Sequence, residues 1–131
     1  MSLTTIILAA GKSTRMLSLK SKLLFKISGE HIIEHVCRAA VSVNSKNIVC
    51  VLGNSPQQLK DFIKKNKIQS VDQKNPCGTA DAVKTAISSM PVNKNNKILI
   101  LCGDVPFISP ATLKIMVSKL DNSDLCLGTY I

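Results

Sequence analysis

Residues 6–26 read IILAAGKSTRMLSLKSKLLFK, a stretch in which an apolar run gives way to a segment whose only charged residues are cations. The apolar run ends at Gly11, and no Asp or Glu occurs before Glu30. Glycine lets the backbone turn tightly and approach a ligand, and small neighbours such as Ala10 and Ser13 let successive N–H groups point at phosphate oxygens. Cations without adjacent carboxylates keep their charge for such a ligand. The pattern predicts a buried strand followed by an anion-binding loop; the alternative is a strand beside a solvated basic face.

The composition favours one globular domain with a small phosphorylated ligand. Hydrophobic residues make up 45% of the 131 residues, which is enough for a core and excludes a disordered chain. Seventeen Lys and Arg against eight Asp and Glu give a net charge of +9, so the expected partner is acidic: a nucleotide, a nucleic acid or a lipid surface. Aromatic residues make up only 3%, whereas proteins that bind single-stranded nucleic acid use aromatic side chains for base stacking. We therefore expect small-molecule substrates rather than nucleic acid or membrane.

The five cysteines predict reduced thiols in a cytoplasmic protein. Their number is odd, no CxxC pair occurs, and three of them lie in apolar runs, so we expect most of them to be buried. The apolar residues 3–10 lack the basic start of a signal peptide and continue into the glycine loop, which argues against that reading. No apolar run approaches the length of a membrane span.

Hydrophobic patterning predicts four strand–helix repeats followed by a last strand. We expect strands over residues 4–10, 47–52, 68–72, 97–102 and 124–131. We expect helices over residues 31–43, 78–89 and 109–119, and one more that starts at Ser55-Pro56, where a cap precedes a first-turn proline. Apolar strands joined by helices are typical of a parallel sheet covered on both faces. The expected fold class is α/β, a Rossmann-like three-layer sandwich with a mostly parallel sheet, whose ligand lies beyond the carboxyl ends of the strands where strand order reverses.

The chain ends at Tyr130-Ile131, inside the last predicted strand, with no cap or polar tail after it. We therefore expect residues 1–131 to form a single, C-terminally incomplete domain from a longer protein. A natural edge strand is the alternative.

The Gly11-Lys12-Ser13 tripeptide is similar to the end of a phosphate-binding P-loop. That motif requires a glycine five positions before Gly11, where Ile6 stands, and the strand leaves no room for the longer loop. The sequence therefore argues against a P-loop NTPase, although an apolar run precedes Asp104 as in a Walker B strand.

Asp104 is the candidate metal ligand, in the segment LCGDVP at residues 101–106. A carboxylate just past the end of a buried strand lies where a metal–phosphate complex would bind, and Mg²⁺ favours one or two carboxylates together with phosphate oxygens. The alternative is an Asp that caps a turn before Pro106.

Gln73 and Gly78 are candidates for base recognition, in the segment QKNPCGTADA at residues 73–82. The amide of a glutamine offers both donors and an acceptor, which suits the edge of a uracil ring. The glycine lets the backbone approach the ring. A polar strand end followed by an ordinary helix start is the alternative.

His31 and His35 match the H-x-x-E-H pattern of inverted zinc proteases. A zinc site needs a third ligand, and these two are the only histidines of the chain. We therefore interpret the segment as a solvated helix start rather than a zinc site.

Five segments, taken in chain order, resemble one family. They are LAAGKSTRM at residues 8–16, Lys22 with the two leucines after it, GEHIIEHV at residues 29–36, Gln73 with Gly78-Thr79-Ala80, and Gly103-Asp104-Val105-Pro106. The chain resembles the N-terminal uridylyltransferase domain of the bacterial bifunctional N-acetylglucosamine-1-phosphate uridylyltransferase / glucosamine-1-phosphate acetyltransferases. More broadly, it is similar to the sugar-nucleotidyltransferase superfamily, which includes the molybdenum-cofactor (MobA-like) nucleotidyltransferases. The resemblance covers nearly all of this chain but only the nucleotide half of the family's domain, and it implies the nucleotide-diphospho-sugar transferase fold.

The resemblance implies a Mg²⁺-dependent reaction. The phosphate of N-acetylglucosamine 1-phosphate would attack the α-phosphorus of UTP, giving UDP-N-acetylglucosamine and pyrophosphate. Arg15 would grip the phosphates and the leaving pyrophosphate, Lys22 would neutralise charge at the α-phosphate, and Asp104 would hold Mg²⁺. The nucleotide would be contacted by Leu8, Ala10, Gly11, Lys22, Gln73, Gly78, Thr79 and Gly103, with Gln73 and Gly78 at the uracil. The implied setting is the cytoplasmic synthesis of peptidoglycan and lipopolysaccharide precursors, and such families often form homo-oligomers through the acetyltransferase domain.

The chain departs from the family's pattern at three positions. Ser13 replaces the usual second glycine, Ser21 stands where a proline precedes the lysine, and Cys102 occupies a position often held by tyrosine. Serine at position 13 also occurs in molybdenum-cofactor relatives, so the base and the second substrate stay open. The family's sugar-binding segments and a downstream Asn that shares the metal lie beyond the match. The alternatives are therefore a MobA-like enzyme with another second substrate, a non-catalytic nucleotide-binding fragment, and a basic nucleic-acid-binding domain.

Overall fold

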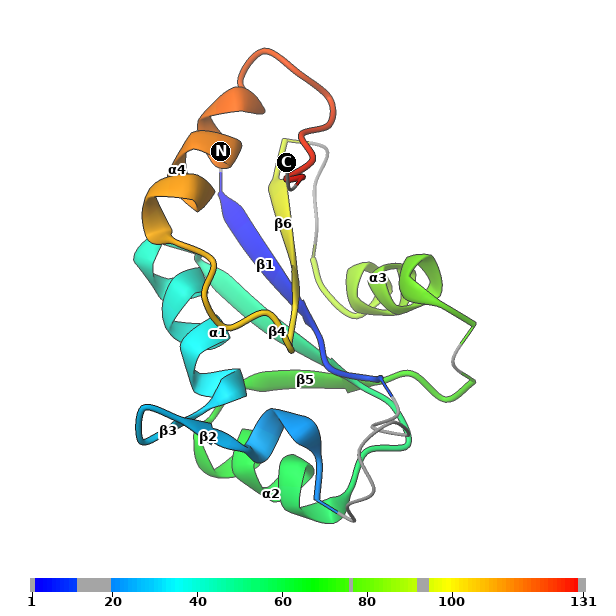
Figure 1. The fold of residues 1–131 in the computed structure, drawn as a ribbon. Coiled ribbons are helices and arrows are strands. Elements are labelled where there is room, and N and C mark those ends of the chain that lie inside the picture. Colours follow the sequence, from blue (N-terminus) through cyan, green and yellow to red (C-terminus); the bar gives the residue numbers. More distant parts are fainter. Residues whose placement is uncertain (1, 12–19, 76, 92–94, 130–131) are drawn as a thin grey trace.

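The computed structural model describes residues 2–11, 20–75, 77–91 and 95–129, and it confirms an α/β fold (Figure 1). In chain order the elements are β1 (Leu3–Leu8), the short 3-10 helix η1 (Lys22–Leu24), β2 (Lys26–Ile27), β3 (Glu30–His31), α1 (Ile32–Ser42), β4 (Asn47–Leu52), α2 (Gln57–Lys65), β5 (Gln69–Asp72), α3 (Thr79–Ser88), β6 (Lys97–Cys102) and α4 (Pro110–Lys119). The predicted bounds of β4 and β6 match the structure, and the predicted helices differ from it by one or two residues at their ends. None of the described helices is long and apolar enough to cross a membrane.

The main sheet is parallel and has the strand order β5-β4-β1-β6. The chain therefore adds β4 and β5 on one side of β1 and then crosses to place β6 on the other side. The register pairs Leu8 with Val51 and with Cys102, so the carboxyl ends of β1, β4 and β6 lie at one edge. The reversal of strand order lies between β1 and β6, and ligands of such sheets bind at this point.

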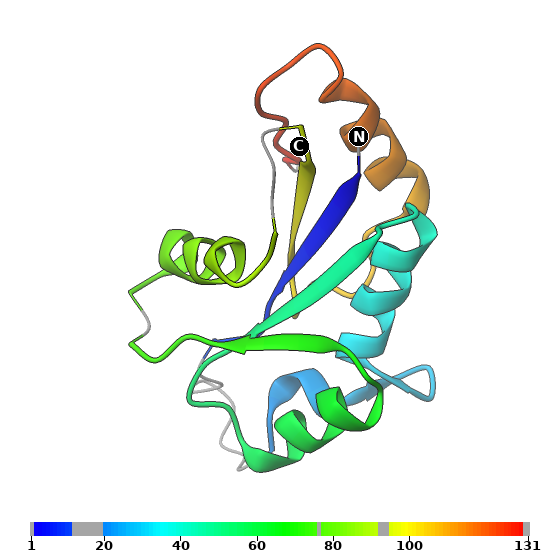
Figure 2. The same cartoon turned by 180° about the vertical axis from the view of Figure 1, so that it is seen from behind.

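Helices cover both faces of the sheet, which gives the predicted three layers (Figures 1 and 2). One face packs against α1, α2 and α4 in the larger core cluster, to which Ile33, Leu59 and Leu113 contribute. The other face packs against α3, whose Ala82 and Ala86 contact Ile6 and its neighbours in a second cluster. The continuous apolar runs of β1 and β4 are explained by this cover on both faces.

The structure contains a small hairpin that sequence reasoning missed. Strands β2 and β3 pair antiparallel, and Ser28 and Gly29 form the turn between them with φ of 52° and 86°. Positive φ at both residues of a two-residue loop is typical of a type I′ turn, which matches the twist of a hairpin. The Ser-Gly pair was the available signal, but strands of two residues leave no alternation to detect.

The predicted last strand is wrong over the residues described. Residues 124–129 have no regular secondary structure, and the side chains of Leu125 and Leu127 are 71% and 74% exposed. A buried strand needs a neighbour in the ladder and cover for its apolar side chains. In the described part of the chain this segment pairs with no strand, and its two leucines lack cover.

The prediction that most thiols are buried is also wrong. Cys50 is buried, Cys37 and Cys126 are half-buried, and Cys77 and Cys102 are exposed; all five are free thiols. The exposure of Cys102 has a simple cause, because α3 packs against β1, β4 and β5 and leaves that face of β6 open. Ile100, two residues before Cys102, is 47% exposed for the same reason.

The start of α2 lies one residue later than predicted. Pro56 is the N-cap residue, and the Ser55 hydroxyl accepts a hydrogen bond from the backbone N–H of Gly53 at 3.2 Å. Ser55 therefore stabilises the turn after β4 instead of the first turn of the helix.

Candidate functional site

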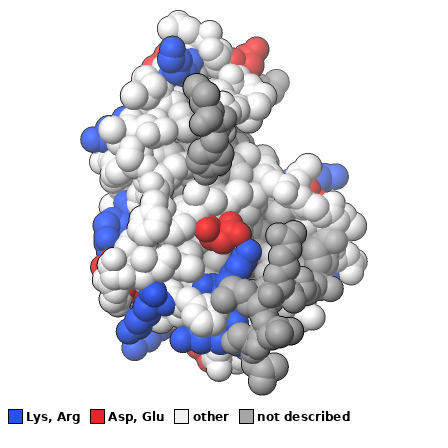
Figure 3. Space-filling view, viewed as in Figure 1, with Lys and Arg blue, Asp and Glu red and all other residues white. Residues whose placement is uncertain are grey.

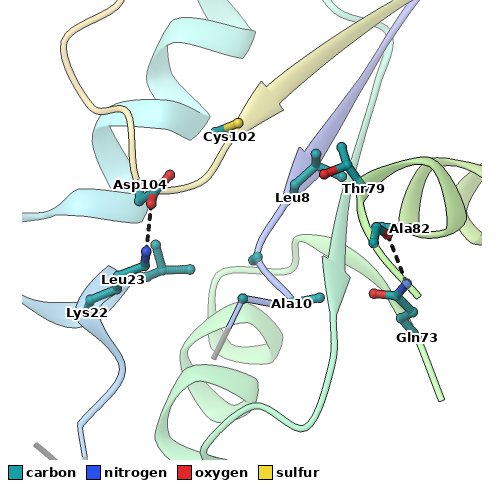
Figure 4. Close-up of a pocket in the computed structure, with 12 residues that line it drawn as sticks. Leu8, Ala10, Lys22, Leu23, Gln73, Thr79, Ala82, Cys102 and Asp104 are labelled. Carbon is teal, nitrogen blue, oxygen red and sulfur yellow. Dashed lines mark hydrogen bonds and ion pairs between the residues drawn. The ribbon is translucent and has the colours of Figure 1, made fainter. Parts of the chain in front are cut away.

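A cavity of about 430 Å³ lies at the carboxyl ends of the parallel strands. Its lining comes from the ends of β1, β5 and β6, from η1 and from the start of α3 (Figure 4). The lining residues are Leu8, Ala9, Ala10, Gly11, Lys22, Leu23, Gln73, Gly78, Thr79, Ala82, Cys102 and Asp104. The topology of the sheet thus places the cavity where the strand order predicted a ligand.

The cavity brings together eight of the ten site residues named from the sequence: Leu8, Ala10, Gly11, Lys22, Gln73, Gly78, Thr79 and Asp104. Arg15 lies outside the described residues. Gly103 does not line the cavity. Its backbone N–H donates to the Leu8 carbonyl at 2.9 Å, and a Cβ at this position would lie 2.9 Å from the same oxygen. Gly103 therefore holds the end of β6 against β1.

Lys22 and Asp104 form an ion pair at one end of the cavity, with 2.6 Å between Nζ and Oδ2. Lys22 opens η1, which is anchored by the buried Leu23 and Leu24 and by the Ser21 hydroxyl, the acceptor for the Leu23 backbone N–H. The hydrogen bond from Lys22 holds the pKa of the Asp104 carboxyl below its ordinary value of 3.8. In Figure 3, basic side chains gather over the part of the molecule where η1 and α2 lie, with an acidic patch beside them. Positive charge therefore dominates this region.

Gln73 lies at the other end of the cavity, with Leu8 and Ala10 between it and Lys22 (Figure 4). Its side chain is only 4% exposed, and its backbone N–H donates to the Leu52 carbonyl at 2.6 Å. Its side-chain Nε2 donates to Asp81 Oδ2 at 2.5 Å and to the Gly78 carbonyl at 3.3 Å. The two ends of the cavity thus differ in chemistry: one holds an amide and helix N–H groups, and the other an ammonium and a carboxylate.

Gly78 and Asp81, at the Gln73 end of the cavity, are positioned by the start of α3. Gly78 has φ of 99°, which is unfavourable for residues with a side chain, and it caps the start of α3. Asp81 lies in the first turn of α3, where the helix dipole stabilises its negative charge. Sequence reasoning missed Asp81; an acidic residue in the first turn of the helix after Gln73 was the available signal.

Gly11 acts by leaving space. A Cβ at this position would meet nothing within 4 Å among the described atoms, and its φ lies outside the left-handed region. The backbone at Gly11 is therefore one that any residue adopts, and the value of glycine there is the room it leaves beside the cavity.

The H-x-x-E-H segment bonds to the backbone of η1 and β2, next to Lys22. His31 Nδ1 lies 2.7 Å from the Leu24 carbonyl oxygen, and His35 Nε2 lies 2.9 Å from that of Ile27. The Glu34 carboxylate accepts from the His31 backbone N–H at 2.6 Å. The segment is a helix start, as expected, with His31 as the N-cap of α1, but the expected solvation is wrong, because both imidazoles are half-buried and bond to backbone carbonyls. In the described ranges, no group of three His, Cys, Asp or Glu side chains is arranged to hold a metal.

A divalent cation bound mainly by phosphate oxygens does not require such a group. Mg²⁺ is commonly held by one or two carboxylates plus substrate phosphates. Asp104 fits this role, since its side chain lines the cavity and is 44% exposed.

Comparisons with known proteins identify the relatives of this fold and site. The family profile described as the MobA-like NTP transferase domain matches residues 5–130. The bifunctional protein GlmU of Alcanivorax borkumensis is 41% identical over 129 residues, which are 98% of this chain and 28% of that relative. The chain therefore spans just over a quarter of the length of this curated relative.

Solved structures show the same fold. A UDP-glucose pyrophosphorylase from Acinetobacter baumanii has a TM-score of 0.76 at 21% identity, covering 95% of this chain and 54% of that one. Rv0371c from Mycobacterium tuberculosis, solved in complex with manganese, has a TM-score of 0.71 at 20% identity, covering 90% of this chain and 59% of that one. At these identities the similarity establishes the fold.

Proposed function

The chain belongs to the MobA-like NTP transferase domain family, and from that premise we propose that it forms the nucleotide-binding half of a uridylyltransferase. The proposed enzyme moves UMP from UTP to N-acetylglucosamine 1-phosphate and gives UDP-N-acetylglucosamine and pyrophosphate. The observation that supports it most is the polarity of the cavity, with Lys22 and Asp104 at one end and Gln73 with Gly78 at the other. A nucleoside triphosphate has the same polarity, with a base at one end and phosphates at the other. The 41% identity to a GlmU protein supports the choice of substrates.

The reaction requires the protein mainly to position the two substrates and to stabilise the charge on the phosphates. An oxygen of the sugar phosphate attacks the α-phosphorus of UTP, and the bond from that phosphorus to the pyrophosphate oxygen breaks. Lys22 would neutralise charge on the α-phosphate, because its ammonium lies at the charged end of the cavity, opposite Gln73. Arg15 would bind the leaving pyrophosphate, as its place in the glycine–arginine motif indicates. Asp104 would bind Mg²⁺ and thereby release Lys22 from their ion pair.

Mg²⁺ would supply positive charge to the phosphate oxygens when bound. The opposite end of the cavity would select the base. Gln73, Gly78 and Thr79 would contact uracil, and the backbone around Leu8, Ala10 and Gly11 would contact the nucleoside. Gly103 would contribute indirectly, by holding the end of β6 in place. We further propose a cytoplasmic location and a role in cell-wall precursor synthesis, in keeping with the GlmU similarity and with the five free thiols.

Pyrophosphate release tests the proposal. Purified protein is incubated with Mg²⁺, UTP and N-acetylglucosamine 1-phosphate, using the product of the complete gene. We expect release that depends on both substrates and falls at least a hundredfold in Lys22→Ala, since one charge-stabilising group is worth that much. Lys26→Ala is the matched control, because Lys26 is exposed on the hairpin and outside the cavity. No release from the complete gene product would contradict the proposed activity.

A non-catalytic nucleotide-binding fragment is the second candidate, because this chain spans only 28% of the GlmU relative. Calorimetry on residues 1–131 distinguishes the two. A binding fragment takes up UTP with Mg²⁺ and does not bind the sugar phosphate, whereas a complete active site binds both. A MobA-like enzyme with another second substrate would bind a nucleotide but release no pyrophosphate with N-acetylglucosamine 1-phosphate.

A further inference from the structure

The Gln73 carboxamide has a defined orientation. Two groups lie within hydrogen-bond distance of its nitrogen, the Asp81 carboxylate and the Gly78 carbonyl, and both can only accept hydrogen bonds. Turning the amide over would direct its oxygen at two other oxygens. Because the side chain is 4% exposed, water could not compensate for that contact. The nitrogen of Gln73 therefore faces α3, as the dashed line in Figure 4 shows.

This orientation leaves the amide oxygen for the cavity. Both N–H groups of the side chain are used by Asp81 and Gly78, while no donor among the described residues bonds to Oε1. In Figure 4 the oxygen points away from the bond to α3. The first N–H groups of α3, beginning at Thr79, have no partner within the helix. The base end of the cavity thus offers one acceptor next to backbone donors.

We infer that Asp81 is a positioning residue that sets the base preference of the site by fixing the Gln73 amide. This inference rests on the proposed function and deepens it. The edge of uracil presents a ring N–H beside a carbonyl oxygen, which complements an acceptor beside a donor. The edge of cytosine presents a ring nitrogen without hydrogen beside an amino group, so its lone pair would face the oxygen of Gln73. Asp81 therefore favours uracil without touching the base.

Loss of the Asp81 carboxylate should relax this preference. Without it, Gln73 keeps only the weaker contact to Gly78 at 3.3 Å, and the amide can rotate to present its N–H groups to cytosine. Asp81→Asn keeps the shape of the side chain and offers either a donor or an acceptor, so the contact at position 81 no longer forces one orientation of Gln73 and only the weaker contact to Gly78 still favours it. Lys84→Ala is the matched control, since Lys84 is an exposed residue of the same helix and does not line the cavity.

Calorimetry with UTP and CTP, each with Mg²⁺, measures the preference. We expect the wild-type protein to prefer UTP and the ratio of the two dissociation constants to fall about tenfold in Asp81→Ala and Asp81→Asn, the effect of one hydrogen bond. Lys84→Ala should keep the wild-type ratio. A wild-type ratio in both Asp81 variants, with UTP binding retained, would overturn the inference.

Solvent exchange of the Gln73 side-chain amide protons tests the orientation without any nucleotide. The two NMR signals are identified by their loss in Gln73→Leu. We expect slow exchange with water in the wild type and in Lys84→Ala, and faster exchange in Asp81→Ala. Equal exchange in all three proteins would overturn the role of Asp81. If the wild type binds neither nucleotide, the proposed function fails, and the exchange rates still decide whether Asp81 orients Gln73.

Discussion

Lys22 and Asp104 are separated by 82 positions in the sequence, yet their Nζ and Oδ2 atoms lie 2.6 Å apart at the carboxyl edge of the sheet. The contact joins η1 to the turn after β6, across the point where strand order reverses. Both side chains are a third or more exposed, so the pair contributes little to stability, about 0–1 kcal/mol. Its position at the cavity gives it a place in the proposed function, because a cation and the carboxylate that we propose binds Mg²⁺ are held together in the ligand-free protein.

Asp104→Asn separates the proposed metal-binding role of this carboxylate from its small structural role. We expect the Mg²⁺-dependent part of UTP affinity to disappear, because a neutral amide is a poor Mg²⁺ ligand. The free energy of unfolding should change by less than about 1 kcal/mol. Calorimetry with and without Mg²⁺ measures the first quantity, and urea unfolding measures the second. An unchanged Mg²⁺ effect in a folded variant would show that another group holds the metal.

The titration of Asp104 should depend on Lys22. Since the hydrogen bond from Lys22 lowers the pKa of Asp104, we expect its carboxyl to titrate below 3.8 in the ligand-free protein and closer to 3.8 in Lys22→Ala. The ion pair should therefore stabilise the folded protein above pH 3.8, and this stabilisation should be lost as the pH falls through the lowered pKa of Asp104. Carboxyl ¹³C shifts measured against pH, with Asp104→Asn to assign the signal, follow this titration. An identical midpoint in Lys22→Ala would exclude the ion pair in solution.

Gly103→Ala should destabilise the fold. Its new Cβ would lie 2.9 Å from the Leu8 carbonyl oxygen, so β1 and the end of β6 would have to separate. Overpacking of this kind costs about 1–3 kcal/mol, which urea unfolding would detect. Gly11→Ala is the matched comparison, because a Cβ there meets no atom of the described residues within 4 Å. We expect Gly11→Ala to keep wild-type stability and to weaken UTP binding, since its methyl group would lie beside the cavity. Equal stability of the two variants would contradict this account.

The cysteines should divide into two reactivity classes. Burial raises the pKa of Cys50 to about 12 and that of Cys37 to about 11, so neither forms the reactive thiolate near neutral pH. Cys77 and Cys102 are exposed. We expect iodoacetamide to label Cys77 and Cys102 in the folded protein and to spare Cys50 and Cys37, as read by peptide mass spectrometry. Bound UTP should slow labelling of Cys102, which lines the cavity. Rapid labelling of Cys50 under native conditions would show that the core opens.

Local signals predicted most of the secondary structure. The runs at Asn47–Leu52 and Lys97–Cys102 are apolar after their first residue, and both form the expected strands. Ser109 caps α4 as predicted, with its hydroxyl accepting from the Thr112 N–H at 3.0 Å. The predictions failed where the burial of an apolar segment depends on packing by residues that are distant in the sequence. The apolar side chains of Leu125 and Leu127, and Ile100 on the outer face of β6, look like core in the sequence, but all three are exposed in the structure.

The sequence alone determined most of the alternation of strands and helices, the cation-rich composition of the segment after β1, and the chemical types of residue that follow each strand. These properties are local, because they follow from composition, glycine placement and hydrophobic period. The tertiary structure decided which of those residues meet: Lys22 with Asp104, and Asp81 with Gln73. Such contacts depend on the register of parallel strands and on the crossover that places β6 beside β1, and both are properties of the whole sheet rather than of any segment.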